Sequence, residues 1–189
     1  MSSGRTRTFD TYNQADAAVC IGRLPNHGRV AKVFDLIAPD RTADDPVELN
    51  ALGLMRVAIL DQLVSAGCPD ELAVKASRVG SEQMADDLIQ ELEPGFLVCC
   101  KNLTSVAEVT YIPADPSNGY KEVEKLVNSG EWVSVTQIDL GVLLETVKKN
   151  LQARIRSFEE TKRYSAEAIA EALRDAFSLR DLIESAYQK

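Results

Sequence analysis

The chain has little of the chemistry on which enzymes and metal sites depend. It contains one histidine, His27, so any Ser-His-Asp or Cys-His catalytic arrangement would have to use this residue. Neither a P-loop nor a G-x-G-x-x-G segment is present, which leaves nucleotide binding without support. Histidine and cysteine do not cluster at metal-ligand spacing. We therefore expect no enzymatic activity, no metal site and no cofactor.

Cysteine is scarce and is not arranged in a C-x-x-C pair. The four cysteines are Cys20, Cys68, Cys99 and Cys100. Cys99 and Cys100 are adjacent in an expected strand, so their side chains should point to opposite faces of a sheet. Buried thiols in a reduced, cytoplasmic protein are the simplest interpretation, and a redox switch is the alternative.

Long hydrophobic runs are also missing. No stretch approaches the roughly 20 apolar residues that a membrane span requires. The first residues, MSSGRTRTFD, lack the apolar region of a secretory signal. We expect a cytoplasmic protein that does not bind membranes. With 189 residues, of which 45% are hydrophobic, the chain can bury the core of one domain or of two small ones.

Acidic residues outnumber basic ones, and the formal net charge is −8. Such a charge argues against a general nucleic-acid coat. Its distribution is uneven, because residues 1–34 carry a net charge of +3, residues 35–100 carry −9 and residues 101–189 carry −2. Any DNA-contacting surface is therefore expected in the first of these segments.

Residues 12–34 predict two short helices joined by a tight turn. Gly22 is expected to end the first helix, and Asn26 is expected to cap the second. The second helix would face inward with Val30, Ala31, Val33 and Phe34. Its exposed side would carry Asn26, His27, Arg29 and Lys32, whose side chains can reach bases and phosphates. A helix-turn-helix that reads DNA is one interpretation, and a helical hairpin that only packs a core is the other.

Further elements complete an expected N-terminal helical domain, residues 1–92. Residues 35–46 contain two prolines and four aspartates and are predicted to be a loop, where the wing of a winged helix-turn-helix would lie. A long helix is expected over 47–66 with Gly67 as its stop. Pro69 would open a short helix, and Ser81 would cap another that runs to Leu92.

The second expected domain, residues 93–189, is a small α/β effector or dimerisation part, so the predicted fold class is α+β. Strands are predicted over 96–100, 106–112 and 132–138, and helices over 120–127, 139–158 and 165–187. The last helix has an apolar seam of alternating three- and four-residue spacing, which could join two subunits or pack within its own domain. The seam residues predicted for dimerisation are Ile169, Ala172, Ala176, Leu179 and Ile183, with Ala186 continuing the pattern.

Residues 12–78 resemble the MerR-like winged helix-turn-helix regulators of bacteria. The resemblance lies in Ala17-Ala18, Gly22, Pro25, Val30 and, after the expected wing, the run LVSAGCPDELAVKA. Residues 133–154 also resemble the C-terminal part of one subset of that family. The two stretches together span about half of the chain.

The resemblance implies a homodimeric, sequence-specific transcription regulator that binds double-stranded DNA. It assigns Asn26, His27, Arg29 and Lys32 to the recognition helix and Arg23 to the turn. The expected wing, however, offers only Arg41 against the three acids Asp40, Asp44 and Asp45. A second hypothesis is therefore a protein-interaction module, antitoxin-like or adaptor, that keeps a degenerate helix-turn-helix.

Overall fold

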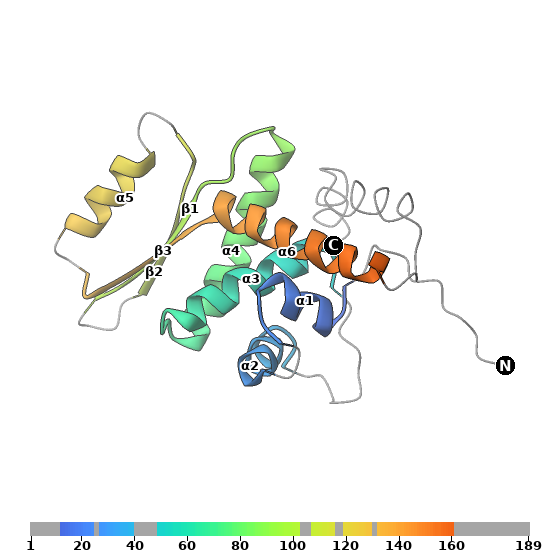
Figure 1. Cartoon of the computed structure of the whole chain (residues 1–189). Helices are drawn as coiled ribbons and strands as arrows, with labels where there is room; N and C mark the ends of the chain where they lie inside the picture. Colours follow the sequence, from blue (N-terminus) through green and yellow to red (C-terminus); the bar gives the residue numbers. More distant parts are fainter. Residues whose placement is uncertain are drawn as a thin grey trace.

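The computed structural model describes residues 12–24, 27–39, 49–102, 107–115, 119–129 and 132–160. These residues form six helices and a three-stranded antiparallel sheet, which confirms the predicted α+β class (Figure 1). In chain order the elements are α1 (Gln14–Cys20), α2 (Gly28–Ile37), α3 (Ala51–Ser65), α4 (Asp70–Ile89), β1 (Phe96–Lys101), β2 (Ala107–Ile112), α5 (Gly119–Asn128), β3 (Ser134–Asp139) and α6 (Leu140–Glu160).

Helix α1 is defined at both ends by local hydrogen bonds. The side chain of Asn13 accepts from the backbone N–H of Asp16, and the Asp16 carboxylate accepts from the N–H of Asn13, which is a capping box. After Cys20 the chain turns at Gly22, whose φ of +69° lies in the left-handed region that glycine adopts without strain. The predicted glycine stop is confirmed.

Helix α2 differs from the prediction at its start and on one side. His27 is its N-cap in place of Asn26, because the His27 Nδ1 accepts the backbone N–H of Arg29 at 3.2 Å. Val30, Val33 and Phe34 are fully buried as predicted, whereas Ala31 is exposed. Ala31 follows Val30 by one residue, a rotation of about 100° that takes it out of the buried row.

A backbone bridge joins the segment just before α1 to the segment just before α3. Tyr12 and Leu49 each donate an N–H to the other's carbonyl, at 2.7 and 2.8 Å, and both side chains are buried.

The predicted loop over 35–46 was wrong at its start, since α2 continues to Ile37. Residues 40–48, which contain most of the expected wing including Asp40, Arg41, Asp44 and Asp45, lie outside the described residues.

One continuous helix, α4, replaces the two that the sequence predicted after Pro69. Ser81 does not cap a helix: it is buried, and its Oγ donates to the carbonyl of Arg78 one turn earlier. Gly80 does not break the helix either. Its missing side chain leaves room for residues of the neighbouring elements. A Cβ placed there would lie 2.9 Å from Leu97 Cδ2 and 3.3 Å from Ile59 Cδ1. The glycine lets α4 pass close to strand β1.

The long helix before it, α3, begins at Ala51 and not at residue 47, and Gly67 follows its end as expected.

The sheet has the strand order β2-β1-β3, with both pairs antiparallel. Its two faces are covered by different helices: α3, α4 and α6 lie on one side and α5 on the other (Figure 1). Cys99 belongs to the main core with the helices, while Cys100 packs in a second cluster with Val123 of α5. The predicted opposite orientation of the two cysteines is confirmed.

Helix α6 joins the sheet to the N-terminal helices. Its residues Leu144, Val147 and Leu151 belong to the same buried core as Ala17 of α1, and the Asn150 Nδ2 donates to the carbonyl of Cys20 at 2.8 Å. The predicted domain boundary near Glu93-Pro94-Gly95 falls between α4 and β1, and buried residues from both sides share this core. Within the described residues, no helix combines the length and apolar character required to cross a membrane.

The C-terminal end of α4 is fixed to the sheet by a buried carboxylate. Asp87 Oδ2 accepts the hydroxyl of Tyr111 on β2 and the backbone N–H of Gly95. Burial raises the pKa of Asp87, which is 8% exposed. This polar link and the close approach at Gly80 hold α4 against the sheet at two points.

Replacing Gly80 with valine tests the close packing of α4 on β1. We expect Gly80→Val to lower the free energy of unfolding by about 1–3 kcal/mol, because the added side chain overpacks the contact with Leu97. The measurement is urea denaturation. Gly28→Val is the matched control, since a Cβ at Gly28 has no neighbour within 4 Å, and its change should stay within about 0.5 kcal/mol. Equal effects of the two substitutions would contradict this packing.

Candidate nucleic-acid interface

The candidate interface is built on α2, which lies at the surface of the helical part of the molecule (Figure 1). The buried side chains of Val30, Val33 and Phe34 hold α2 in the core with α3. Its outer side carries Gly28, Ala31, Lys32 and Asp35, all exposed. Helix α2 is therefore supported from one side and open on the other, as a helix that enters a groove must be.

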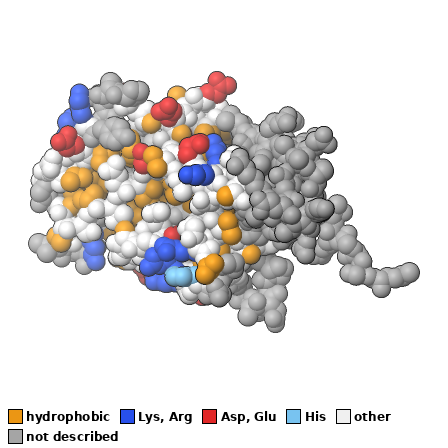
Figure 2. Space-filling view, viewed as in Figure 1, with side chains coloured by type: hydrophobic (Ala, Val, Ile, Leu, Met, Phe, Trp, Pro, Cys, Tyr) orange, Lys and Arg blue, Asp and Glu red, His pale blue; other side chains and the backbone are white. Residues whose placement is uncertain are grey.

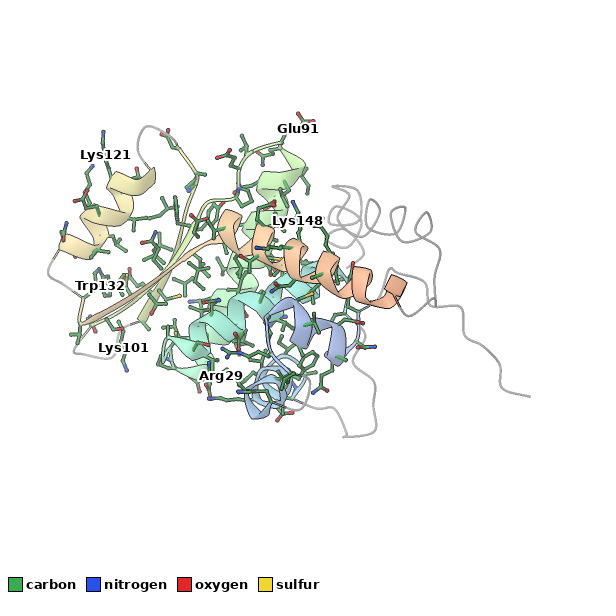
Figure 3. The ribbon with its side chains drawn as sticks, in the orientation of Figure 1. Arg29, Glu91, Lys101, Lys121, Trp132 and Lys148 are labelled. Carbon is green, nitrogen blue, oxygen red and sulfur yellow. The ribbon has the colours of Figure 1, made fainter. Side chains whose placement is uncertain are left out.

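Arg29 lies at the flank of α2 and reaches toward α3 (Figure 3). Its side chain is half-buried, and its Nη1 donates to the Oγ of Ser65 at 2.7 Å. Ser65 is the last residue of α3. The sequence predicted Arg29 on the exposed side of the helix, and the structure gives its guanidinium a hydroxyl partner within the chain.

Arg23 differs from Arg29 in facing a buried carboxylate. It follows the Gly22 turn, and its Nη2 lies 3.5 Å from Asp61 Oδ2 and 3.4 Å from Ser65 Oγ. Asp61 is only 3% exposed. Among the described residues, the Arg23 Nε and the Asp61 Oδ1 are buried without a hydrogen-bond partner. The nearly buried carboxylate therefore relies on Arg23 for its compensating charge.

Lys32 forms the most exposed of these contacts. Its Nζ lies 2.8 Å from Oδ1 of Asp70, the first residue of α4, and the two side chains are 49% and 46% exposed. An ion pair in such an environment contributes little free energy and exchanges readily with other partners. His27 is exposed at the start of α2, where one ring nitrogen is engaged as the cap.

The structure thus brings four of the predicted site residues to one side of the molecule. Figure 2 shows Lys and Arg side chains gathered beside the single histidine at the lower edge of this face. Sequence reasoning missed their acceptors, Asp61, Ser65 and Asp70. Asp61 and Ser65 are four residues apart on α3 and therefore share a helix face, which was a readable signal for a polar site on a mostly apolar helix.

Several predicted site residues lie outside the described residues. They are Asn26, from the expected recognition helix, and the expected dimerisation residues Ile169, Ala172, Ala176, Leu179 and Ile183. The side chains of residues 154–160 at the end of α6 are likewise not described.

A groove lies away from α2, between the end of α4 and the first half of α6. This groove has a volume of about 900 Å³ and is lined by Leu88, Leu92, Phe96, Val142 and Lys148, among others. Among the residues that the structure describes, no group of three or more His, Cys, Asp or Glu side chains is placed to hold a metal ion.

Comparison of the chain with protein-family models, with curated proteins and with solved structures gave no significant match. The function is therefore inferred from the residues and geometry of this chain.

The unequal burial of the two ion pairs gives a stability prediction. Arg23→Ala should lower the free energy of unfolding by about 1–3 kcal/mol, because it leaves the buried Asp61 carboxylate without its partner. Lys32→Ala removes a member of an exposed pair and should change that free energy by less than about 1 kcal/mol. Chemical denaturation measures both. If Lys32→Ala proves the more damaging of the two, the assigned structural role of Arg23 is wrong.

Proposed function

We propose that the chain is a cytoplasmic, sequence-specific DNA-binding regulator that acts as a homodimer, with α2 as its recognition helix. The observation that carries the proposal is the α1–Gly22 turn–α2 arrangement, in which α2 is anchored by Val30, Val33 and Phe34 and open on its other side. Most of this unit also lies in residues 1–34, the one of the three sequence segments with a net positive charge. The resemblance of residues 12–78 to MerR-like regulators agrees with this assignment.

The outer side of α2 suits close approach to a DNA groove. Gly28 and Ala31 are small, so the helix backbone can come near the base edges. The methyl group of Ala31 can contact a thymine methyl, which is an apolar form of base recognition. His27 and Arg29, at the start of the helix, supply hydrogen-bond donors near the same edge, where recognition helices make most base contacts.

The internal partners of Arg29 and Lys32 are compatible with DNA contacts. Lys32 can exchange its half-exposed Asp70 partner for a phosphate at little cost. Arg29 is bonded to a neutral hydroxyl, so its positive charge stays uncompensated by that contact and available to an anion. Arg23, by contrast, compensates buried Asp61, and we assign it to positioning the turn.

A binding experiment with substituted proteins tests these roles. Arg29→Ala should weaken binding to the selected site by about 1–3 kcal/mol if Arg29 reads a base. Lys32→Ala should weaken binding to all sequences alike and reduce the dependence of log affinity on log salt by about 1. Fluorescence anisotropy over a salt series measures both effects.

Lys121→Ala is the control for the loss of one positive charge. Lys121 is exposed on α5, on the other side of the sheet from the helices that carry Arg29 and its partner (Figure 3). Its substitution should leave DNA affinity unchanged. Unchanged binding by both Arg29→Ala and Lys32→Ala would remove the assignment of α2 as the recognition helix.

A second candidate function is a protein-interaction module, antitoxin-like or adaptor, in which the helix-turn-helix no longer reads DNA. The observation that favours it is that Arg23, Arg29 and Lys32 all have acceptors within the chain. In addition, the apolar side chain of Leu24, which precedes α2 in the chain, is 70% exposed. Together with the exposed small residues Gly28 and Ala31 of α2, it suits contact with another protein.

This candidate predicts a stoichiometric protein partner that contacts the outer side of α2. Ala31→Glu should abolish that complex, because it places a charge in the apolar part of the contact, while the exposed position should leave stability unchanged. Co-purification with the wild-type and substituted chains from source lysate, followed by sizing of the complex, measures the loss. A partner retained equally by both chains would contradict the proposed surface.

A further inference from the structure

Two cysteines from separate parts of the fold meet between the α3–α4 turn and the sheet. Cys68 follows Gly67 in this turn and is half-buried, while Cys99 lies in the middle of β1 and is 3% exposed. Both belong to the region of the main core, with Cys68 packed against it. Besides burial, which is the larger cause, each thiol affects the ionisation of the other: Cys68 contributes to the raised pKa of Cys99, and Cys99 opposes the rise at Cys68.

The two thiols are reachable by a small molecule. They share the lining of a pocket of about 400 Å³, together with Lys101, Ser134 and Thr136. The pocket lies where the turn faces β1 and β3. A reagent in it would meet Cys68 first, because Cys68 is the more exposed of the two.

The other two cysteines provide internal controls. Cys100 is adjacent to Cys99 but faces the opposite side of the sheet, in the cluster with Val98 and Val123. Cys20 is fully buried in α1, where its carbonyl accepts a hydrogen bond from Asn150 of α6. Neither shares the lining of the pocket that contains Cys68 and Cys99.

We propose that Cys68 and Cys99 form a reversible intramolecular disulfide when the chain meets a hydroperoxide. The Cys68 thiolate attacks one peroxide oxygen, the O–O bond breaks, and the departing hydroxide takes a proton to become water. The sulfur of Cys99 then attacks the Cys68 sulfenic acid, and the hydroxide that leaves takes the Cys99 proton. Two thiols and one hydrogen peroxide become one disulfide and two waters, with two electrons passing from sulfur to oxygen.

The environment of the thiols sets the order and the pace of these steps. Burial raises the pKa of Cys99 to about 12 and also raises the pKa of Cys68, whereas Cys99 opposes the rise at Cys68. Cys68 is therefore the thiol that ionises first. Since both thiols are protonated at neutral pH, the reaction should be slow there and should accelerate as the pH increases.

The disulfide would tie the α3–α4 turn to the central strand. That turn lies between Ser65 and Asp70, which hold Arg29 and Lys32 of the candidate interface. An effect of oxidation on DNA binding would rest on the proposed function. The experiment therefore detects the disulfide directly, and its outcome does not depend on whether the chain binds DNA.

The experiment exposes the full, reduced chain to hydrogen peroxide and counts the remaining thiols by alkylation. Wild type should lose two of its four thiols, and non-reducing peptide mapping should recover a cross-link between the Cys68 and Cys99 peptides. Dithiothreitol should restore both thiols. Cys100→Ser should behave as wild type, whereas Cys68→Ser and Cys99→Ala should give no intramolecular disulfide.

The wild-type peptide map decides the matter even if a substituted chain folds poorly. A disulfide that contains Cys20 or Cys100, a cross-link between two chains, or oxygen adducts on Cys68 without a cross-link would each overturn the proposal. Loss of the cross-link in Cys100→Ser would do the same, because Cys100 faces the other side of the sheet.

Discussion

The burial of most of α3 is the constraint on which the rest of the structure depends. Leu54, Val57, Ile59, Leu60 and Leu63 are all fully buried, although they point in different directions around the helix. Helices α1, α2, α4 and α6 and strand β3 all pack against it. A helix whose apolar side chains point in several directions must be covered on several sides, and this requirement fixes where the helix-turn-helix unit can lie.

The single acid on this helix, Asp61, links the buried core to the candidate interface. Its carboxylate is almost fully withdrawn from water, so it needs a positive partner. Arg23, immediately after the Gly22 turn, supplies that charge. The ion pair therefore orients the turn between α1 and α2, and Ser65 one turn further along α3 receives Arg29. A polar face of one buried helix thus determines how the cations of α2 are presented.

This arrangement separates the cations by role. Arg23 is committed to a buried carboxylate, Arg29 contacts a neutral hydroxyl, and Lys32 contacts an exposed carboxylate. Releasing a cation costs less free energy when its partner is exposed to water, and less when that partner is neutral, so Lys32 and Arg29 are the two that can turn to DNA. The net charge of −8 makes such local presentation necessary, because the chain as a whole repels phosphates.

Local patterns predicted much of the fold, and the failures have a common cause. The strands were placed to within two residues at each end, the helix stop at Gly22 was correct, and the opposite faces of Cys99 and Cys100 followed from strand geometry. These features depend on neighbouring residues. The break expected at Ser81 was wrong because the neighbouring Gly80 serves close packing against Leu97, a residue on another element. The acceptors of the α2 cations were missed for the same reason, since Asp61 and Asp70 meet α2 only after folding.

The measurement that tests the central claim most directly is selection of sheared source-genome DNA by the purified full chain at near-physiological salt, followed by sequencing. A dimeric regulator with α2 in the major groove should recover a few sites with paired half-sites about 10 base pairs apart, or a multiple of this spacing. Arg29→Ala should lose those sites while Lys121→Ala retains them. Recovery of nothing above background by the folded wild-type chain would contradict the account and favour a protein partner for α2.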